Sequence, residues 1–180
     1  MKWKLLLLIV GLSLTGSESL AGYFEVGMSY NYRQNFVDEN NSTIQTSVTG
    51  SVSYYFWEQS AIELSYTDGT STITLDTVDV DVKFQFYGAD LVLSFAGRDA
   101  TFRPYVKVGG VYQVKTTRTR ISSIDRTVDF EGVAPSAGVG FRVKLTQNFV
   151  FRSGLDLWAT PINDQTQFDM VGRAGVSWLF

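Results

Sequence analysis

Large apolar residues alternate with small or polar residues along most of the chain from residue 22 onward. In YFEVGMSYNYR (23–33), every second position is apolar or aromatic, and the positions between carry Glu25, Gly27, Ser29, Asn31 and Arg33. Successive side chains of a β-strand point to opposite faces, so this period of two predicts strands with one apolar and one polar face. No helical period competes with it beyond the leader.

Eight alternating segments follow one another, which predicts an all-β chain with eight strands of about ten to fourteen residues. The segments are 23–33, 44–56, 61–66, 78–95, 102–115, 133–145, 149–158 and 168–180. The connections between them alternate in length. The short ones, WEQS, GRDAT and TQN, have three to five residues, and the long ones are polar stretches of nine to sixteen residues.

The segment 78–95 changes phase near its middle. Even positions up to Phe86 are apolar, whereas odd positions are apolar from Tyr87 onward. A slip of one residue within a strand is typical of a β-bulge, so we predict a bulge near Tyr87–Gly88.

The first 21 residues have the three parts of a secretory signal peptide. Two lysines precede the ten-residue apolar core Leu5–Leu14, and Ser19 and Ala21 are small residues before a cleavage point. The core is too short for a spanning helix, which needs about 20 residues. We therefore predict cleavage after Ala21 and a single mature domain, 22–180.

Alternating strands suit two architectures, a soluble β-sandwich and a membrane-spanning β-barrel. The apolar face is the core of a sandwich, whereas in a barrel it meets lipid and the polar face lines the interior. Here many polar-face residues are small, such as Ser51 and Gly138, and aromatic residues such as Tyr54 and Trp178 end the segments. Aromatic girdles at both membrane interfaces produce that placement. The pattern therefore favours an eight-stranded antiparallel up-and-down transmembrane β-barrel.

PYVKVGGVY (104–112) and the final VGRAGVSWLF (171–180) carry a family resemblance. In these segments the chain resembles the small eight-stranded outer-membrane barrels of Gram-negative bacteria, the OmpA/OmpX-like and OmpW-like group. The resemblance implies an outer-membrane location and recognition of the chain end by the barrel-assembly machinery. It assigns that assembly signal to Ala174, Val176, Trp178 and Phe180. Gly172 departs from the family pattern, which often has an aromatic residue at the ninth position from the end.

The interior of an eight-stranded barrel is just wide enough to be filled by side chains. The polar faces put both signs of charge there, and buried charges have to be paired. We expect a lumen charge network, structural in the simpler interpretation and gating in the other, formed by Glu25, Glu63, Arg103, Lys107, Arg142, Arg152, Asp156 and Arg173. The same alternation places further charges in the lumen, namely Arg33, Asp79, Asp81, Lys83 and Lys144. Alternation does not fix the register, so the pairings stay open.

Composition narrows the function classes. The chain contains no Cys and no His, which excludes thiolate and imidazole chemistry, and we expect no catalytic residue, no metal and no other cofactor. Neighbouring acids such as Asp79 and Asp81 are more simply balanced by Lys83 than used as a catalytic pair. A net charge of -3 does not suggest a nucleic-acid partner.

The long polar stretch from about 116 to 131 is predicted to be an exposed loop. Its arginines, Arg118, Arg120 and Arg126, could bind a polyanion such as lipopolysaccharide phosphate, or could simply keep the loop in water. The expected partners are outer-membrane lipids and lipopolysaccharide, with the protein a monomer. Two functions follow, a structural or surface-interaction barrel and, alternatively, a narrow channel for ions or small solutes.

Overall fold

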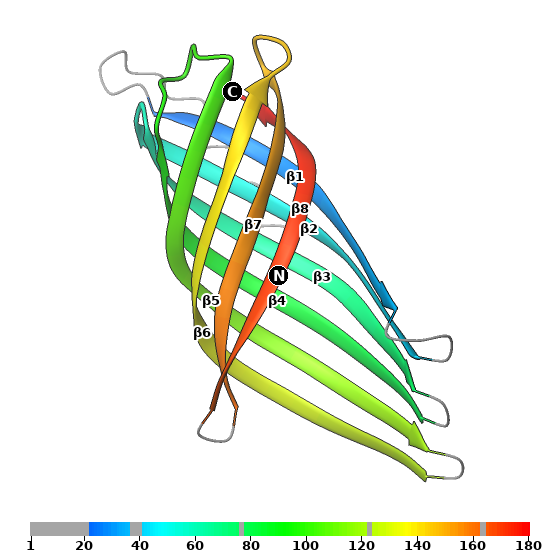
Figure 1. Cartoon of the computed structure of the whole chain (residues 1–180). Helices are drawn as coiled ribbons and strands as arrows, with labels where there is room; N and C mark the ends of the chain where they lie inside the picture. Colours follow the sequence, from blue (N-terminus) through cyan, green and yellow to red (C-terminus); the bar gives the residue numbers. More distant parts are fainter. Residues whose placement is uncertain (1–21, 37–40, 76–77, 122–123, 163–164) are drawn as a thin grey trace, which may run out of the picture.

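The computed structural model describes residues 22–36, 41–75, 78–121, 124–162 and 165–180. Eight antiparallel strands form a closed barrel in which each strand pairs with the next and β8 pairs with β1 (Figure 1). They are β1 (Tyr23–Phe36), β2 (Asn41–Trp57), β3 (Ser60–Leu75), β4 (Val78–Ser94), β5 (Phe102–Ile121), β6 (Ile124–Lys144), β7 (Phe149–Ile162) and β8 (Gln165–Leu179). The predicted fold class is confirmed, and the predicted signal peptide lies outside the described residues.

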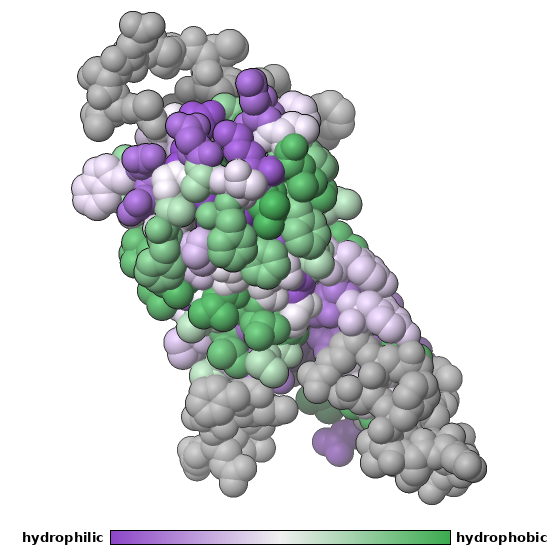
Figure 2. Space-filling view, turned by 45° about the horizontal axis from the view of Figure 1, so that its top comes forward, coloured by the Kyte–Doolittle hydropathy of each residue, from purple (hydrophilic) through white to green (hydrophobic). Residues whose placement is uncertain are grey.

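The outer face of the barrel is apolar over its middle. Side chains at alternate positions of the strands are exposed there, among them Met28, Leu64, Val108 and Val139. Figure 2 shows this apolar surface on one face of the molecule, with polar groups toward the end that carries the short turns. Because these side chains would be unfavourable in water and favourable in hydrocarbon, the exposed apolar band is the surface that meets lipid.

β4 changes the polarity of its faces without a bulge. Its pairing with β3 and with β5 keeps one register over its whole length. Phe84 and Phe86 are buried inside the barrel, whereas Lys83 and Gln85 are exposed outside it. The predicted bulge near Tyr87–Gly88 is therefore wrong. The apparent slip arises because the outer face turns polar where the strand leaves lipid, while the inner face turns apolar.

A row of tyrosines marks the level of that change. Tyr66 is paired with Tyr87, and Tyr87 with Tyr112, and their ring centroids lie 5.1 and 6.3 Å apart. The next outward residues beyond the row include Asp68 and Gln85. Tyrosine places an apolar ring and a polar hydroxyl at a membrane surface, so this row fits one interface.

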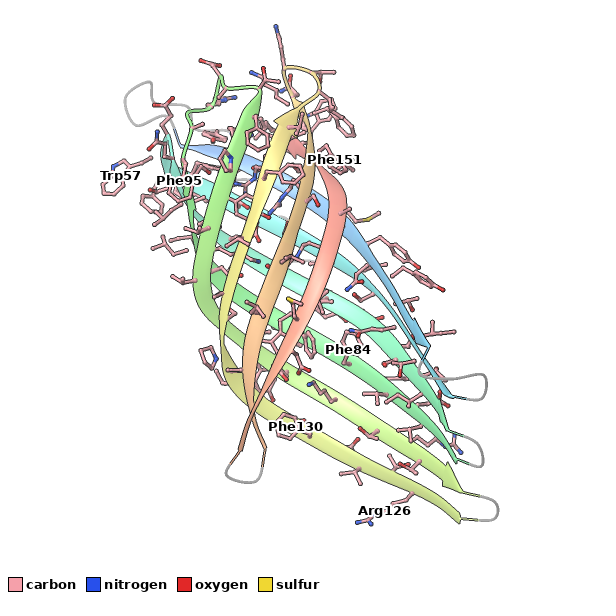
Figure 3. All side chains as sticks on the ribbon, in the orientation of Figure 1. Trp57, Phe84, Phe95, Arg126, Phe130 and Phe151 are labelled. Atoms are coloured by element: carbon pink, nitrogen blue, oxygen red, sulfur yellow. The ribbon has the colours of Figure 1, made fainter. Side chains whose placement is uncertain are left out.

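The second aromatic girdle lies near the short turns. Trp57, Phe95 and Phe151 stand close to that end of the barrel in Figure 3, and Phe130 and Arg126 lie toward the opposite end. Trp57 and Phe95 are largely exposed. The described ladders also contain a register shift here, between Tyr55 and Trp57 next to the β2–β3 turn.

The predicted short turns agree with the structure, but the predicted long loops are wrong. Only residues 37–40, 76–77, 122–123 and 163–164 separate the strands at that end. The polar stretches continue as strands because they are rich in threonine, which suits a pleated surface, and because each residue gains a cross-strand partner. One example is the hydrogen bond of 2.7 Å between the hydroxyls of Thr49 and Thr67.

Two ladders end early. β1 and β8 pair from Glu25↔Leu179 to Tyr30↔Ala174, and β6 and β7 pair from Lys144↔Val150 to Ser136↔Trp158. The β7–β8 hairpin therefore diverges from its neighbours at the end opposite the C-terminus, as Figure 1 shows. Strands β1–β6 continue together on the other side as a protruding sheet.

The change of polarity can be tested by labelling, because the chain has no native cysteine. A cysteine replacing Gln85 should react in intact cells with a water-soluble, membrane-impermeant maleimide. A cysteine replacing Leu91, on the same outer face but within the lipid band, should stay protected. Equal labelling of both positions would mean that the membrane boundary does not lie at the tyrosine row.

Candidate functional site

Three carboxylates stand at one level of the inner wall formed by β1–β4. Glu25 is paired with Ser53, Ser53 with Glu63, and Glu63 with Asp90. Directly paired residues of adjacent antiparallel strands share a face, with Cβ atoms about 4.5–5.5 Å apart. These four buried residues, called the acidic rung below, concentrate negative charge on one side of the interior.

The opposite wall carries a row of arginines on β5–β7. Arg103 is paired with Arg142, and Arg142 with Arg152, and all three are buried. Like charges directly opposite each other are destabilising by themselves. The repulsion within this row, called the arginine rung below, therefore has to be offset by ion pairs with the acidic rung.

Ion pairs cross the lumen between the two rungs. Arg142 Nε lies 3.3 Å from Glu25 Oε1, and Arg152 Nη1 lies 3.6 Å from the same oxygen. Arg152 Nη2 donates a hydrogen bond to Glu63 Oε2, and Arg142 Nη2 lies 3.9 Å from that atom. Strands far apart around the barrel are thus held together through its centre.

Hydroxyl groups complete the shells of the two glutamates. Tyr55 Oη donates to Glu25 Oε2 at 2.6 Å, and Ser177 Oγ donates to Glu25 Oε1 at 2.7 Å. Ser53 Oγ donates to Glu63 Oε2 at 3.0 Å. Carboxylates that accept several charge-assisted or hydroxyl hydrogen bonds are stable as anions in a buried site.

Lys107 joins three carboxylates one level further along the lumen. Its Nζ lies 3.4 Å from Glu63, 3.2 Å from Asp90 and 3.1 Å from Asp156. Lys107, Gly138 and Asp156 are directly paired across β5, β6 and β7. A Cβ on Gly138 would lie 2.5 Å from Asp156 Oδ1 and 2.9 Å from Lys107 Cε, so the glycine makes room for this ion pair.

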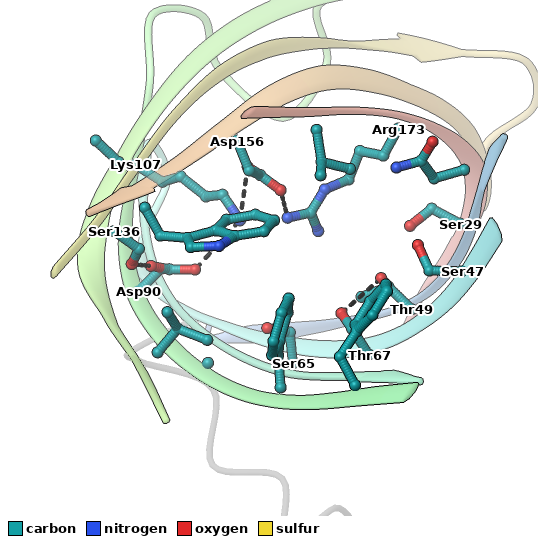
Figure 4. A pocket seen from close by; sticks show the side chains of 18 of the residues that line it. Ser29, Ser47, Thr49, Ser65, Thr67, Asp90, Lys107, Ser136, Asp156 and Arg173 are labelled. Atoms are coloured by element: carbon teal, nitrogen blue, oxygen red, sulfur yellow. Dashed lines mark hydrogen bonds and ion pairs between the residues drawn. The ribbon is translucent and has the colours of Figure 1, made fainter. Parts of the chain in front are cut away.

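Figure 4 shows how Asp156 connects the lysine to Arg173 of β8. Arg173 Nη2 pairs with Asp156 Oδ2, while Ser136 Oγ donates to Asp90 Oδ1 at 2.6 Å. Asp156 and Asp90 therefore each have a cationic partner, and Asp90 also accepts a hydrogen bond from a hydroxyl group.

Apolar clusters lie on both sides of the charged layers. Toward the termini, Tyr23 stacks on Tyr55 with centroids 4.0 Å apart, and both pack with Ala61, Val92, Tyr105, Val150 and Leu179. Toward the opposite end, Phe84 and Phe86 pack with Val111, Ala134 and Trp158. The first cluster holds residues with no exposed surface, so it closes the lumen at the end with the short turns.

A small cavity remains between the charged layer and the second cluster. It has a volume of about 40 Å³, room for only a few water molecules. Hydroxyl residues of β1–β3 line one side of it, and the charged residues of β4–β8 line the other (Figure 4). The hydroxyl side consists of Ser29, Ser47, Thr49, Ser65 and Thr67.

The structure places all eight residues of the expected lumen charge network inside the barrel, where seven join ion pairs with one another. The eighth, Arg103, contacts Tyr23 instead. Asp90 and Tyr55 belong to the same network but were missed. Asp90 lies between the outward residues Ala89 and Leu91, so its lumen position could have been read from the alternation.

Two other lumen assignments are wrong. Asp81 and Lys83 lie on the exposed outer face, because β4 inverts its polarity without slipping. Lys144 is on the inner face of β6, paired with the buried Val150, and at the end of the strand it lies 3.7 Å from Asp99 in a turn. The side chains of Arg33 and Asp79 are not among those that the structure describes.

The predicted polyanion loop is not a loop. Arg118 and Arg120 belong to β5 and Arg126 belongs to β6. Arg118 is paired with Thr127, and Arg126 with Thr119, so Arg118 and Arg126 leave opposite faces of the hairpin. The Arg120 side chain is not among those that the structure describes.

The described part of the chain contains no group of three acidic residues arranged to hold a metal ion. It also contains no helix long and apolar enough to cross a membrane.

Removing the charge of Glu63 tests the network. A Glu63→Gln change leaves Arg152 and Lys107 short of a buried counter-charge, which typically costs about 3–5 kcal/mol. Urea unfolding of the refolded protein in detergent micelles should show this loss. A matched Glu58→Gln change at an exposed turn position should leave the unfolding midpoint unchanged. Equal midpoints for wild type and Glu63→Gln would mean that these pairs add no stability.

Solved structures of other barrels resemble this one. The N-terminal barrel domain of OprF from Pseudomonas aeruginosa is 19% identical, with a TM-score of 0.61 over 88% of this chain and 97% of that one. Ail of Yersinia pestis is 14% identical, with a TM-score of 0.60 over 88% and 99% of the two chains. OprG of Pseudomonas aeruginosa is 12% identical, with a TM-score of 0.58 over 88% and 95%. Likeness at this identity concerns the fold.

No curated protein matches the chain in sequence. Residues 5–180, however, match the family described as the outer membrane protein beta-barrel domain. That match covers almost the whole sequence and agrees with the closed eight-stranded barrel and its lipid-facing band. The chain therefore belongs to the outer-membrane β-barrel family of Gram-negative bacteria.

Proposed function

We propose that this protein is a closed outer-membrane barrel with a structural or surface-interaction role. The observation that carries the proposal is the state of the lumen. Glu25, Glu63 and Arg142 have no exposed surface, and the aromatic cluster around Tyr23 and Tyr55 covers them on the side of the termini. None of the main pockets formed by the described residues is lined by Glu25, Glu63 or Arg142.

The energetics of the lumen favour a fixed interior. Opening a path would separate Arg152 from Glu63 and Arg142 from Glu25 in a buried site. Breaking a buried pair leaves uncompensated charges and is strongly unfavourable. The network therefore fits a structural role, in which it holds opposite walls together.

The protruding sheet is the surface left for interactions. Beyond the tyrosine row its outer face carries threonines and charges of both signs, for example Thr70, Asp81 and Lys83. Main-chain pairing holds these side chains in a fixed array, so a partner would meet an ordered surface. Ail has been solved with the heparin analogue sucrose octasulfate. In this chain Arg118 and Arg126 lie on opposite faces of the β5–β6 hairpin, so both cannot easily bind the same polyanion.

Single-channel recording separates this proposal from its alternative, a narrow channel. The purified, folded protein in a planar bilayer should give no conductance steps at either polarity, because the buried pairs close the lumen. Steps that change on Arg142→Gln or Arg173→Gln replacement would establish the channel and overturn the closed-barrel proposal. A known porin reconstituted in the same way serves as the positive control.

The chain end tests the proposed contact with the assembly machinery. Phe180 follows β8, is mostly exposed, and donates one backbone hydrogen bond to Phe24. Deleting Phe180 should reduce the folded, heat-modifiable barrel in outer membranes several-fold while hardly changing urea unfolding of the refolded protein. Losses of similar size in both measurements would show that Phe180 acts only through packing.

A further inference from the structure

The two connected charge layers of the lumen hold more cations than carboxylates. The cations are Arg103, Lys107, Arg142, Arg152 and Arg173, and the carboxylates are Glu25, Glu63, Asp90 and Asp156. Arg173 is partly exposed and is paired with Asp156, whereas the other eight residues are buried. A buried cation without a carboxylate beside it is costly and calls for a further anion.

Arg103 is the cation without a carboxylate partner among the described residues. Its side chain is only 1% exposed, and its one hydrogen bond is a long one, 3.4 Å from Nη1 to Tyr23 Oη. Its Nε and Nη2 have no hydrogen-bond partner in the described part of the chain. Two donors of a permanent cation are therefore left over in a site shielded from water.

The opposed arginine has a donor left over as well. Arg142 is directly paired with Arg103 and is completely buried. Its Nε is used by Glu25 and its Nη1 by Ser94, whereas its Nη2, 3.9 Å from Glu63 Oε2, has no hydrogen-bond partner among the described residues. Both guanidinium groups of this directly paired couple thus keep N–H donors without a hydrogen bond, and like charges directly opposite each other are destabilising.

We propose that Arg103 and Arg142 together bind a small monovalent inorganic anion of halide size. Such an anion would accept hydrogen bonds from both guanidinium groups, screen their repulsion and give Arg103 a counter-charge. Water could satisfy the N–H donors but not the charge. This inference is independent of whether the protein contacts a surface partner.

The surroundings limit the size of the anion and indicate its route. The Arg142 Cζ lies 4.4 Å from the ring centroid of Tyr105 and 5.7 Å from that of Tyr55, so aromatic rings flank this guanidinium and favour a small anion. Arg103 is the second residue of β5, directly after the β4–β5 turn. In that turn Arg98 lies over the Tyr23 ring at 4.5 Å, which adds positive charge at the end where an anion would enter.

Bromide is a suitable probe because it can be located by its anomalous scattering. Crystals of the full mature protein grown with sodium bromide should show an anomalous peak within hydrogen-bond distance of Arg103 and Arg142. In solution, urea unfolding should be followed in bromide and in gluconate at matched ionic strength. Once the site is saturated, the unfolding constant should fall about tenfold for each tenfold rise in bromide.

Two variants separate the site from general salt effects. Arg103→Met removes the excess charge and should abolish both the peak and the difference between bromide and gluconate. Arg126→Met removes the same charge from an exposed position on the β5–β6 hairpin and should keep both. If Arg103→Met does not fold, Arg103→Gln takes its place, and the wild-type diffraction result stands without either.

The proposal is overturned by either of two results. These are density at the two arginines without an anomalous peak, as water alone would give, or a bromide dependence that the Arg103 variant retains in full. A peak that requires Arg103, together with a bromide dependence that Arg126→Met preserves, supports it.

Discussion

Burying charge inside a narrow barrel is possible only if opposite charges meet across its centre. In this protein the acidic rung lies on β1–β4 and the arginine rung on β5–β7, so neither wall is stable without the other. The network links strands far apart in sequence, as in the pair between Arg152 and Glu63, 89 residues apart. The closed shape of the sheet is then supported from inside as well as by the ladder between β1 and β8. Glycine at Gly138 belongs to the same arrangement, because any side chain there would separate Lys107 from Asp156.

The second constraint is the change of solvent along each strand. Inside the bilayer the apolar face must point outward, and beyond it the outer face must be polar while the inner face packs. β4 meets both requirements by exchanging its apolar face at the tyrosine row, with Phe86 inside and Tyr87 outside. A single regular strand therefore serves two environments. The protruding sheet of β1–β6 extends from this boundary with continuous strand pairing.

Much of the fold could be predicted because a period of two is local information. Alternation identified the strands, the lipid face and the inward direction of residues such as Glu63 and Arg142. It failed at Asp81 and Lys83, because a polar outer face in water and a polar inner face in a lumen have the same spacing in sequence. It failed also at the long polar stretches, where threonine pairing extends the strands. The cross-lumen partners depend on the register and tilt of the whole barrel, which no short segment contains.

The register also explains why the interior carries one charge too many. Arg103 has the same position in the arginine rung as Arg142 and Arg152, yet the acidic rung has a serine, Ser53, between its two glutamates. The two glutamates are already shared between Arg142 and Arg152, and Asp90 is occupied by Lys107. Arg103 therefore lies beside an aromatic cluster, and two of its N–H groups have no hydrogen-bond acceptor in the described part of the chain. Among the ionised side chains of the two described charge layers, Arg103 is thus the position where a component from outside the chain would complete the electrostatics of the barrel.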